Sequence, residues 1–156
     1  MYTTRVTGRV NASRAAVYRA LLDADAVARW RTPDGMRAEV HAFDAREGGA
    51  FRVSLTYDAP NATGKSEGRT DTYHGHFREL VPDERVVEVI EFETADPALA
   101  GEMVISTYLT ETAGGSGTEV VMVHEGVPDA VPPGDNETGT RMALANLARL
   151  VESAYS

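Results

Sequence analysis

The stretch TRMALANLARLVESAY, residues 140–155, decides the fold that we predict for this chain. Its apolar residues recur at helical spacing, at Leu144, Leu147, Val151 and Tyr155, which is typical of an amphipathic helix. The preceding segment, residues 127–139, holds three of the seven prolines, so we expect irregular chain there and a helix that starts near residue 140. One long helix is therefore predicted to close the chain.

The chain before this helix shows two other patterns. Residues 3–12 have the β-branched content of a strand, and residues 13–30 show the spacing of two short helices, for which Ser13 and Asp25 are the expected caps. Between residues 36 and 126 apolar and polar residues mostly alternate, and turns rich in glycine or proline separate the alternating stretches. Because these connections are too short for parallel crossovers, we predict an antiparallel meander of about six strands.

These elements predict an α+β fold in which a curved antiparallel sheet of about six to seven strands wraps around the C-terminal helix. A bent sheet and a single helix cannot fill the whole volume between them, so this arrangement favours a cavity. The polar segment at residues 61–69 is interpreted as a mobile surface loop and not as a linker. The 156 residues are therefore assigned to one domain, residues 1–156.

The composition argues against several classes of function. There are 15 Lys and Arg residues against 24 Asp and Glu residues, and the net charge of −9 disfavours nucleic acid and anionic membranes as partners. No apolar stretch approaches the ~20 residues that span a bilayer, and the first ten residues lack the apolar core of a secretory signal. The chain has no cysteine, which fits a reducing compartment, so we expect a cytoplasmic protein.

Five stretches, in their order along the chain, carry a family resemblance: SRAAVYRALLDADAVARW, FDAREGGAFRV, YHGHFRELVPDERVV, GTEVVMVHEG and ALANLARLVE. In this order they resemble the START-like, or SRPBCC, helix-grip superfamily, and within it the branch of chaperone-ATPase-activator homologues. The resemblance implies a helix-grip domain. It also implies one of three activities: binding of a lipid, polyketide or aromatic ligand, polyketide cyclisation, or stimulation of a heat-shock chaperone's ATPase.

Two positions depart from this resemblance. Relatives commonly place an aromatic residue after the glycine just ahead of the last helix, whereas this chain has Gly139 followed by Thr140, which predicts a wider cavity at that end. Many relatives have an aromatic residue at the position of Glu88, so this chain places a carboxylate where an apolar wall is expected.

A cavity under the terminal helix would be lined by inward-facing residues of the strands, by the helix, and by Trp30 at its entrance. Phe51, Val53, Leu55 and Tyr57 share one strand face, and period-two counting places Glu88 and His124 inward on two other strands. The predicted ligand-binding set is Trp30, Phe51, Val53, Leu55, Tyr57, Tyr73, Phe77, Glu88, Ile90, Thr107, Met122, His124, Leu144 and Leu147.

Within this set Glu88, His124 and Thr107 form the candidate polar cluster. Desolvation favours the neutral form of a buried carboxyl group, which suits a general acid or base, so Glu88 and His124 are the candidate catalytic residues. Two strand spacings, roughly 10 Å, separate them, which leaves room for a small ligand between their side chains. The structural alternative is that a bulge shifts the register and leaves Glu88 in solvent, or that His124 only holds a loop in place.

The HGH sequence at residues 74–76 places two imidazoles on one strand face, as a metal site would require. Tyr73 and Phe77 alternate with them and are the better core candidates, which sends His74 and His76 to the outer surface. We therefore predict no metal site and no cofactor.

Three functions remain open from the sequence. The first is a carrier or sensor for a small apolar or aromatic molecule. The second is a cyclase-like or hydratase-like enzyme that uses Glu88 and His124, and the third is an interaction domain that activates a chaperone ATPase. A homodimer through the outer face of the sheet or an edge strand is a further expectation, and the sequence ranks the ligand-binding function first.

Overall fold

The computed structural model describes residues 1–58 and 70–154 and confirms the predicted α+β helix-grip fold. Seven strands and three helices follow one another in the predicted order: β1(Tyr2–Val10), α1(Arg14–Leu21), α2(Ala24–Trp30), β2(Met36–Phe43), β3(Ala50–Tyr57), β4(Thr70–Val81), β5(Arg85–Phe92), β6(Met103–Glu111), β7(Thr118–Val127) and α3(Pro133–Ala154). The predicted loop at residues 61–69 and the last apolar position, Tyr155, lie outside the described residues.

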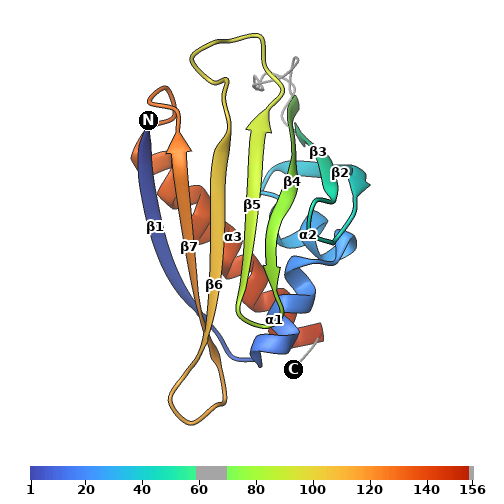
Figure 1. Cartoon of the computed structure of the whole chain (residues 1–156), viewed down its shortest axis with the longest axis vertical. Coiled ribbons are helices and arrows are strands. Elements are labelled where there is room, and N and C mark those ends of the chain that lie inside the picture. The colour runs from blue at the N-terminus through green and yellow to red at the C-terminus, as the bar shows by residue number, and fades with distance from the viewer. Residues whose placement is uncertain (59–69, 155–156) are drawn as a thin grey trace.

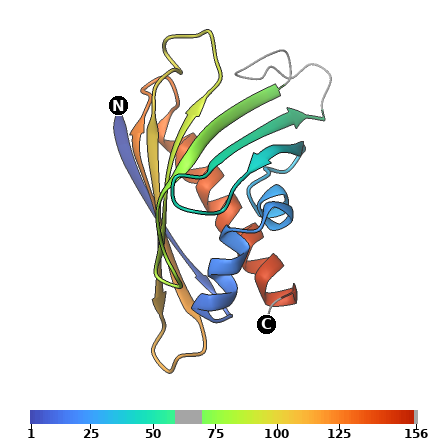
Figure 2. The ribbon, with the colours of Figure 1, turned by 45° about the vertical axis from the view of Figure 1, so that its right-hand side comes forward.

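The strands form one antiparallel sheet in the order β1-β7-β6-β5-β4-β3-β2. The first strand therefore pairs with the last, and the rest of the sheet is a meander. Figure 1 shows α3 running diagonally behind the long strands, and Figure 2 shows the sheet curving around it, with α1 and α2 beside it. The three helices of the described residues lie on the concave side of the sheet, so no helix in this part of the chain covers the convex side.

The predicted apolar row of α3 is the one that faces the sheet. Leu144, Leu147 and Val151 are buried in the same core cluster as residues of β1, β6 and β7. The approach to β1 is close, because a Cβ atom on Gly8 would lie 3.3 Å from Leu144 Cδ1. A small residue in β1 thus allows the helix to pack directly against the strand backbone.

Two local predictions were wrong. The terminal helix starts at Pro133 and not near residue 140, since proline suits the first turn of a helix, where its missing N–H costs nothing. The Pro132 carbonyl accepts a backbone hydrogen bond from Asn136 in this first turn. The second helix is capped by Asp23 and not by Asp25, because Asp23 Oδ1 accepts from the backbone N–H groups of Asp25 and Ala26.

Within residues 1–58 and 70–154, no helix is both long enough and apolar enough to cross a bilayer.

Candidate functional site

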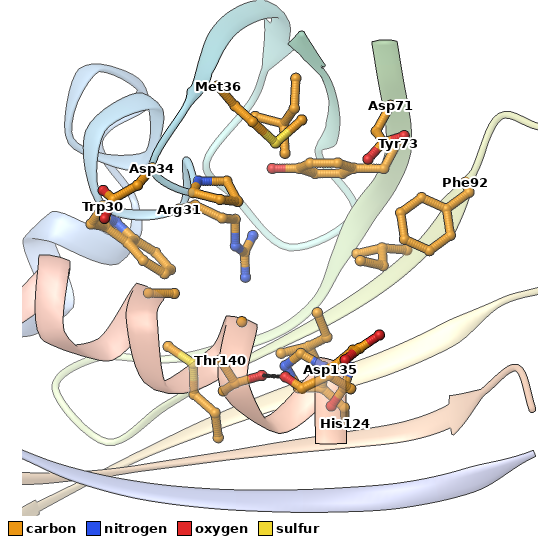
Figure 3. A pocket seen from close by; sticks show the side chains of 18 of the residues that line it. Trp30, Arg31, Asp34, Met36, Asp71, Tyr73, Phe92, His124, Asp135 and Thr140 are labelled. Carbon is orange, nitrogen blue, oxygen red and sulfur yellow. Dashed lines mark hydrogen bonds between the residues drawn. The ribbon is translucent and has the colours of Figure 1, made fainter. Parts of the chain in front are cut away.

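A pocket of about 340 Å³ opens between the first half of α3, the end of α2 and the concave face of the sheet. Figure 3 shows the pocket, with α3 on one side and residues of α2 and β4 on the other. Most of its wall is apolar, and the polar groups come from Arg31 and Asp34, which follow α2, and from side chains of β3, β4, β7 and α3. The lining residues are Trp30, Arg31, Pro33, Asp34, Met36, Leu55, Tyr57, Asp71, Tyr73, Ile90, Phe92, Ile105, Met122, His124, Asp135, Asn136, Gly139, Thr140 and Ala143.

The sequence-predicted binding residues divide into two groups in the structure. One group lies in the pocket wall: Trp30, Leu55, Tyr57, Tyr73, Ile90, Met122 and His124. The other group is buried around the pocket without lining it: Phe51, Val53, Phe77, Glu88, Thr107, Leu144 and Leu147. Five residues of the second group belong to the buried core cluster, in which side chains of the sheet and the helices fill the interior beside the pocket: Phe51, Val53, Phe77, Leu144 and Leu147.

Trp30 has a structural contact of its own. Its ring is buried, and its indole Nε1 donates a hydrogen bond to the Ala20 carbonyl oxygen at 3.1 Å. This bond ties the end of α2 to α1, so the ring forms a fixed part of the pocket wall.

Glu88 is buried, as the alternation of β5 predicts, and it forms an ion pair with Arg31. Arg31 Nη1 and Nη2 donate to the two carboxylate oxygens of Glu88, each at 2.9 Å. The side chains of Arg31 and Glu88 are only 16% and 7% exposed, so the pair lies largely out of water. Burial alone lowers the pKa of Arg31, but the attraction of Glu88 and its hydrogen bonds raise that pKa well above the ordinary value. The guanidinium also lies over the Trp30 ring, 4.9 Å from its centre.

His124 faces the pocket two strands away from Glu88, as predicted. In the sheet register Glu88 pairs with Ile105 on β6, and Ile105 pairs with His124 on β7. Thr107, the third predicted polar residue, lies one inward position further along β6 and pairs with Val86 and Met122. It is fully buried and does not line the pocket, so the polar cluster consists of other side chains.

Asn136 of α3 links His124 to β1. The Asn136 side-chain amide nitrogen lies 3.3 Å from His124 Nδ1, and Asn136 Oδ1 accepts a hydrogen bond from the Thr4 hydroxyl. With its oxygen engaged by Thr4, Asn136 presents its N–H to the ring, which assigns the proton of the neutral imidazole to Nε2. Burial lowers the pKa of His124 to about 4, with Arg31 acting in the same direction and Glu88 opposing it. The imidazole is therefore neutral at neutral pH.

The low pKa of His124 makes folding depend on pH. The unfolded chain takes up this proton near pH 6.5, whereas the folded chain resists it until about pH 4, so stability is lost as the pH falls through this window. Between pH 7 and pH 5 we expect the free energy of unfolding to fall by about 2 kcal/mol more for the wild type than for His124→Gln. Urea denaturation at the two pH values measures this. His76→Gln, which removes an exposed imidazole, is the control, and equal losses for wild type and His124→Gln would contradict the prediction.

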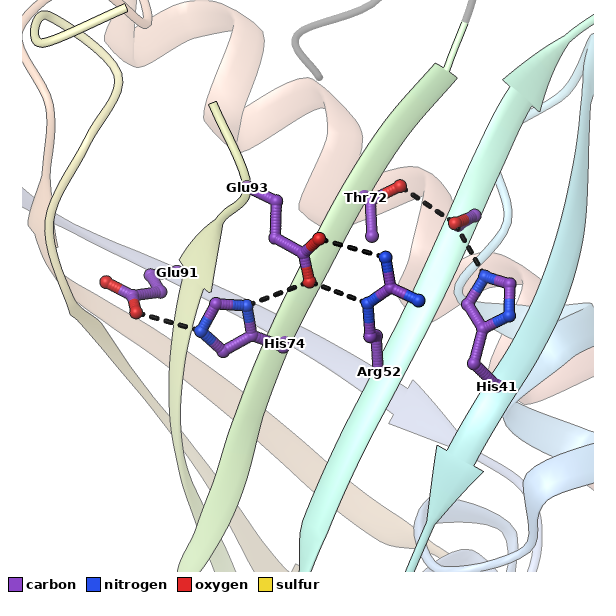
Figure 4. A network of polar contacts seen from close by, with 7 residues as sticks. His41, Arg52, Thr72, His74, Glu91 and Glu93 are labelled. Atoms are coloured by element: carbon purple, nitrogen blue, oxygen red, sulfur yellow. Dashed lines mark hydrogen bonds and ion pairs between the residues drawn. The ribbon is translucent and has the colours of Figure 1, made fainter. Parts of the chain in front are cut away.

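The HGH segment faces the convex side of the sheet, as predicted. His76 is exposed, and Figure 4 shows His74 in a polar network with Arg52, Glu91 and Glu93. His74 Nε2 lies 2.8 Å from Glu91, and His74 Nδ1 lies 3.0 Å from Glu93, which also accepts two bonds from Arg52. The hydrogen bonds from Arg52 lower the pKa of Glu93 to about 2. These contacts between neighbouring strands account for His74 without a metal ion.

Sequence reasoning missed the polar residues that matter most in the pocket. Arg31 was passed over because it follows Trp30 in a segment rich in helix breakers, and its partner Glu88 lies 57 residues away. Asn136 was missed because its segment was expected to be irregular. The one available signal for Arg31 was the unmatched carboxylate at Glu88, since a buried carboxylate normally has a cationic or hydrogen-bonding partner.

The fold and the pocket under its long helix define a helix-grip protein. Residues 11–152 match the family model described as Activator of Hsp90 ATPase homolog 1-like protein. The chain therefore belongs to the Activator of Hsp90 ATPase homolog 1-like family, which confirms the branch of the superfamily indicated by the sequence.

Solved structures support this assignment. Protein CV1439 from Chromobacterium violaceum is 33% identical to this chain and has a TM-score of 0.83, with 97% of this chain and 99% of that chain covered. Protein Ms6760 from Mycobacterium smegmatis is 16% identical, with a TM-score of 0.77, and the match covers 98% of this chain and 92% of that chain. Protein MLL2253 from Mesorhizobium loti is 18% identical, with a TM-score of 0.72, and the match covers 99% of this chain and 100% of that chain. The last two show the fold alone. A search of curated proteins found no significant match.

Proposed function

We propose that this protein binds a small, largely apolar or aromatic molecule in the pocket between α3 and the sheet. The observation that carries the proposal is a pocket of about 340 Å³, within the usual range for small-molecule sites, whose wall is mainly apolar with a few polar groups. A ligand in this position would touch α2, α3 and the inner face of the sheet at the same time.

The geometry supports binding better than the catalytic alternative with Glu88 and His124. Both oxygens of Glu88 accept hydrogen bonds from Arg31, and Arg31, not Glu88, is part of the pocket wall. The neutral imidazole of His124, with a pKa of about 4, is a weak base for proton abstraction. Proton exchange by this pair would require Glu88 to leave its buried partner first.

The remaining expectations stay predictions. They are a cytoplasmic location, a homodimer, and a chaperone partner, the last of which rests on the family alone. A chaperone interaction would need a complementary surface and not a deep pocket, so an experiment on the pocket separates it from ligand binding.

A bulky side chain on the pocket-lining face of α3 should block ligand entry. Gly139 lines the pocket, and a Cβ atom there would have no heavy atom within 4 Å, so Gly139→Phe can extend into the free space. We expect this variant to weaken binding of the neutral fluorescent probe N-phenyl-1-naphthylamine at least about tenfold, because the ring occupies apolar volume that the ligand needs. Fluorescence titration measures the dissociation constant.

Gly134→Phe is the matched control for this experiment. Gly134 is also a glycine of α3 with open space around its Cβ position, but it does not line the pocket. Wild-type affinity in Gly134→Phe together with weak binding in Gly139→Phe would support the proposed site. Wild-type affinity in both variants would mean that the probe binds outside this pocket, and it would overturn the proposal.

A further inference from the structure

The Tyr73 hydroxyl is a buried polar group without a hydrogen-bond partner among the described residues. Tyr73 is only 5% exposed and lines the pocket, and its oxygen has no partner of acceptable hydrogen-bond geometry in the part of the chain that the structure describes. Such a group loses its bonds to water without replacing them, which is unfavourable in the free protein. An unpartnered polar atom in a pocket wall is a feature that a ligand can satisfy.

The surroundings of Tyr73 determine what kind of ligand group would satisfy it. Figure 3 shows its ring directed across the pocket toward Arg31. Burial raises the pKa of Tyr73, and the nearby guanidinium of Arg31 opposes this effect, so the hydroxyl keeps its proton at neutral pH. Arg31 can only donate hydrogen bonds and therefore attracts the oxygen of Tyr73, which leaves the O–H bond free to donate. The complementary ligand atom is an acceptor.

The charges in the pocket indicate that this acceptor is uncharged. The positive charge of Arg31 is already matched by both oxygens of Glu88. Asp34 and Asp135 add exposed carboxylates to the pocket wall, and neither forms an ion pair with a residue in the described ranges. A carboxylate ligand would meet repulsion at the rim, and the described lining residues offer it no unpaired cation.

We propose that the ligand of this pocket carries a neutral carbonyl oxygen, as in a ketone, aldehyde or ester, which accepts a hydrogen bond from Tyr73 Oη. Tyr73 is then the residue that selects oxygenated ligands over hydrocarbons of the same shape. This inference rests on the proposed binding function and adds the chemical class of the ligand to it.

Three naphthalene derivatives test the inference. The ketone 2-acetylnaphthalene and the hydrocarbon 2-isopropenylnaphthalene have nearly the same shape and differ in the acceptor oxygen, and 2-naphthoate carries a carboxylate. We expect the wild type to bind the ketone about tenfold more tightly than the hydrocarbon, a typical gain from one hydrogen bond to an otherwise unpaired group. In Tyr73→Phe the two affinities should become nearly equal, and 2-naphthoate should bind the wild type more weakly than the ketone.

Tyr108→Phe, which removes a hydroxyl from the exposed side of β6, is the control and should keep the preference for the ketone. Thermal melting of each variant shows that it is folded. Equal binding of ketone and hydrocarbon by the wild type, a preference that survives in Tyr73→Phe, or tightest binding of 2-naphthoate would overturn this inference alone. Binding of none of the three compounds would overturn the proposed function as well.

Discussion

Glu88→Gln is expected to lower the free energy of unfolding by about 3–5 kcal/mol. The substitution keeps the size of the side chain but leaves the Arg31 guanidinium, only 16% exposed, without its negatively charged partner. The cost comes from the uncompensated buried charge and not from lost packing, because glutamine occupies nearly the same volume. Urea denaturation of the wild type and the variant at neutral pH measures the difference.

Removing both charges should recover most of the free energy of unfolding that Glu88→Gln loses. In the double variant Arg31→Met/Glu88→Leu no buried charge remains, and apolar pairs of similar volume often match or exceed the stability of a buried ion pair. Asp44→Asn is the control for a surface pair, because Arg46 and Asp44 are 78% and 48% exposed and their pairing contributes little. A small loss in Glu88→Gln, equal to that of Asp44→Asn, would show that the pair is not buried in solution.

The fold was predictable because apolar residues recur with the helical period in α3 and with a period of two in the strands. The spacing of Leu144, Leu147 and Val151 gives the buried side of α3, and simple alternation gives the inward position of His124. The start of α3 was misplaced because its prolines and glycines were interpreted as a break, although proline is also typical of the first turn of a helix. Contacts far away in the chain, from Asn136 to Thr4 and His124, hold this first turn in place.

The site was less predictable than the fold. Alternation tells which residues face inward, but it does not tell where the interior is filled and where it is open. Phe77 and Leu147 are fully buried in the core cluster and do not line the pocket. Tyr73 and Ile90, which also face inward, reach the pocket. The ion pair joins Arg31, the C-cap residue of α2, to Glu88 of β5, which lies 57 residues away. No pattern of residue spacing predicts a contact over this separation.

Gly75→Ala should be among the most damaging single substitutions in the chain. Gly75 lies in the middle of β4 and pairs with Ile90 of β5. A Cβ atom at this position would lie 1.9 Å from the Val89 carbonyl oxygen, a backbone atom that can move only if the pairing of the two strands changes. We expect the free energy of unfolding to fall by about 3 kcal/mol or more.

The affected strands carry Tyr73 and Glu88, so the Gly75→Ala protein should also lose probe binding in the pocket even under conditions where it remains folded. Gly134→Ala is the matched control, since a Cβ atom there meets nothing within 4 Å and alanine favours the helical conformation. It should melt at or slightly above the wild-type temperature. If Gly75→Ala is as stable as Gly134→Ala, the backbones of β4 and β5 do not approach each other at Gly75 as closely as the structure shows.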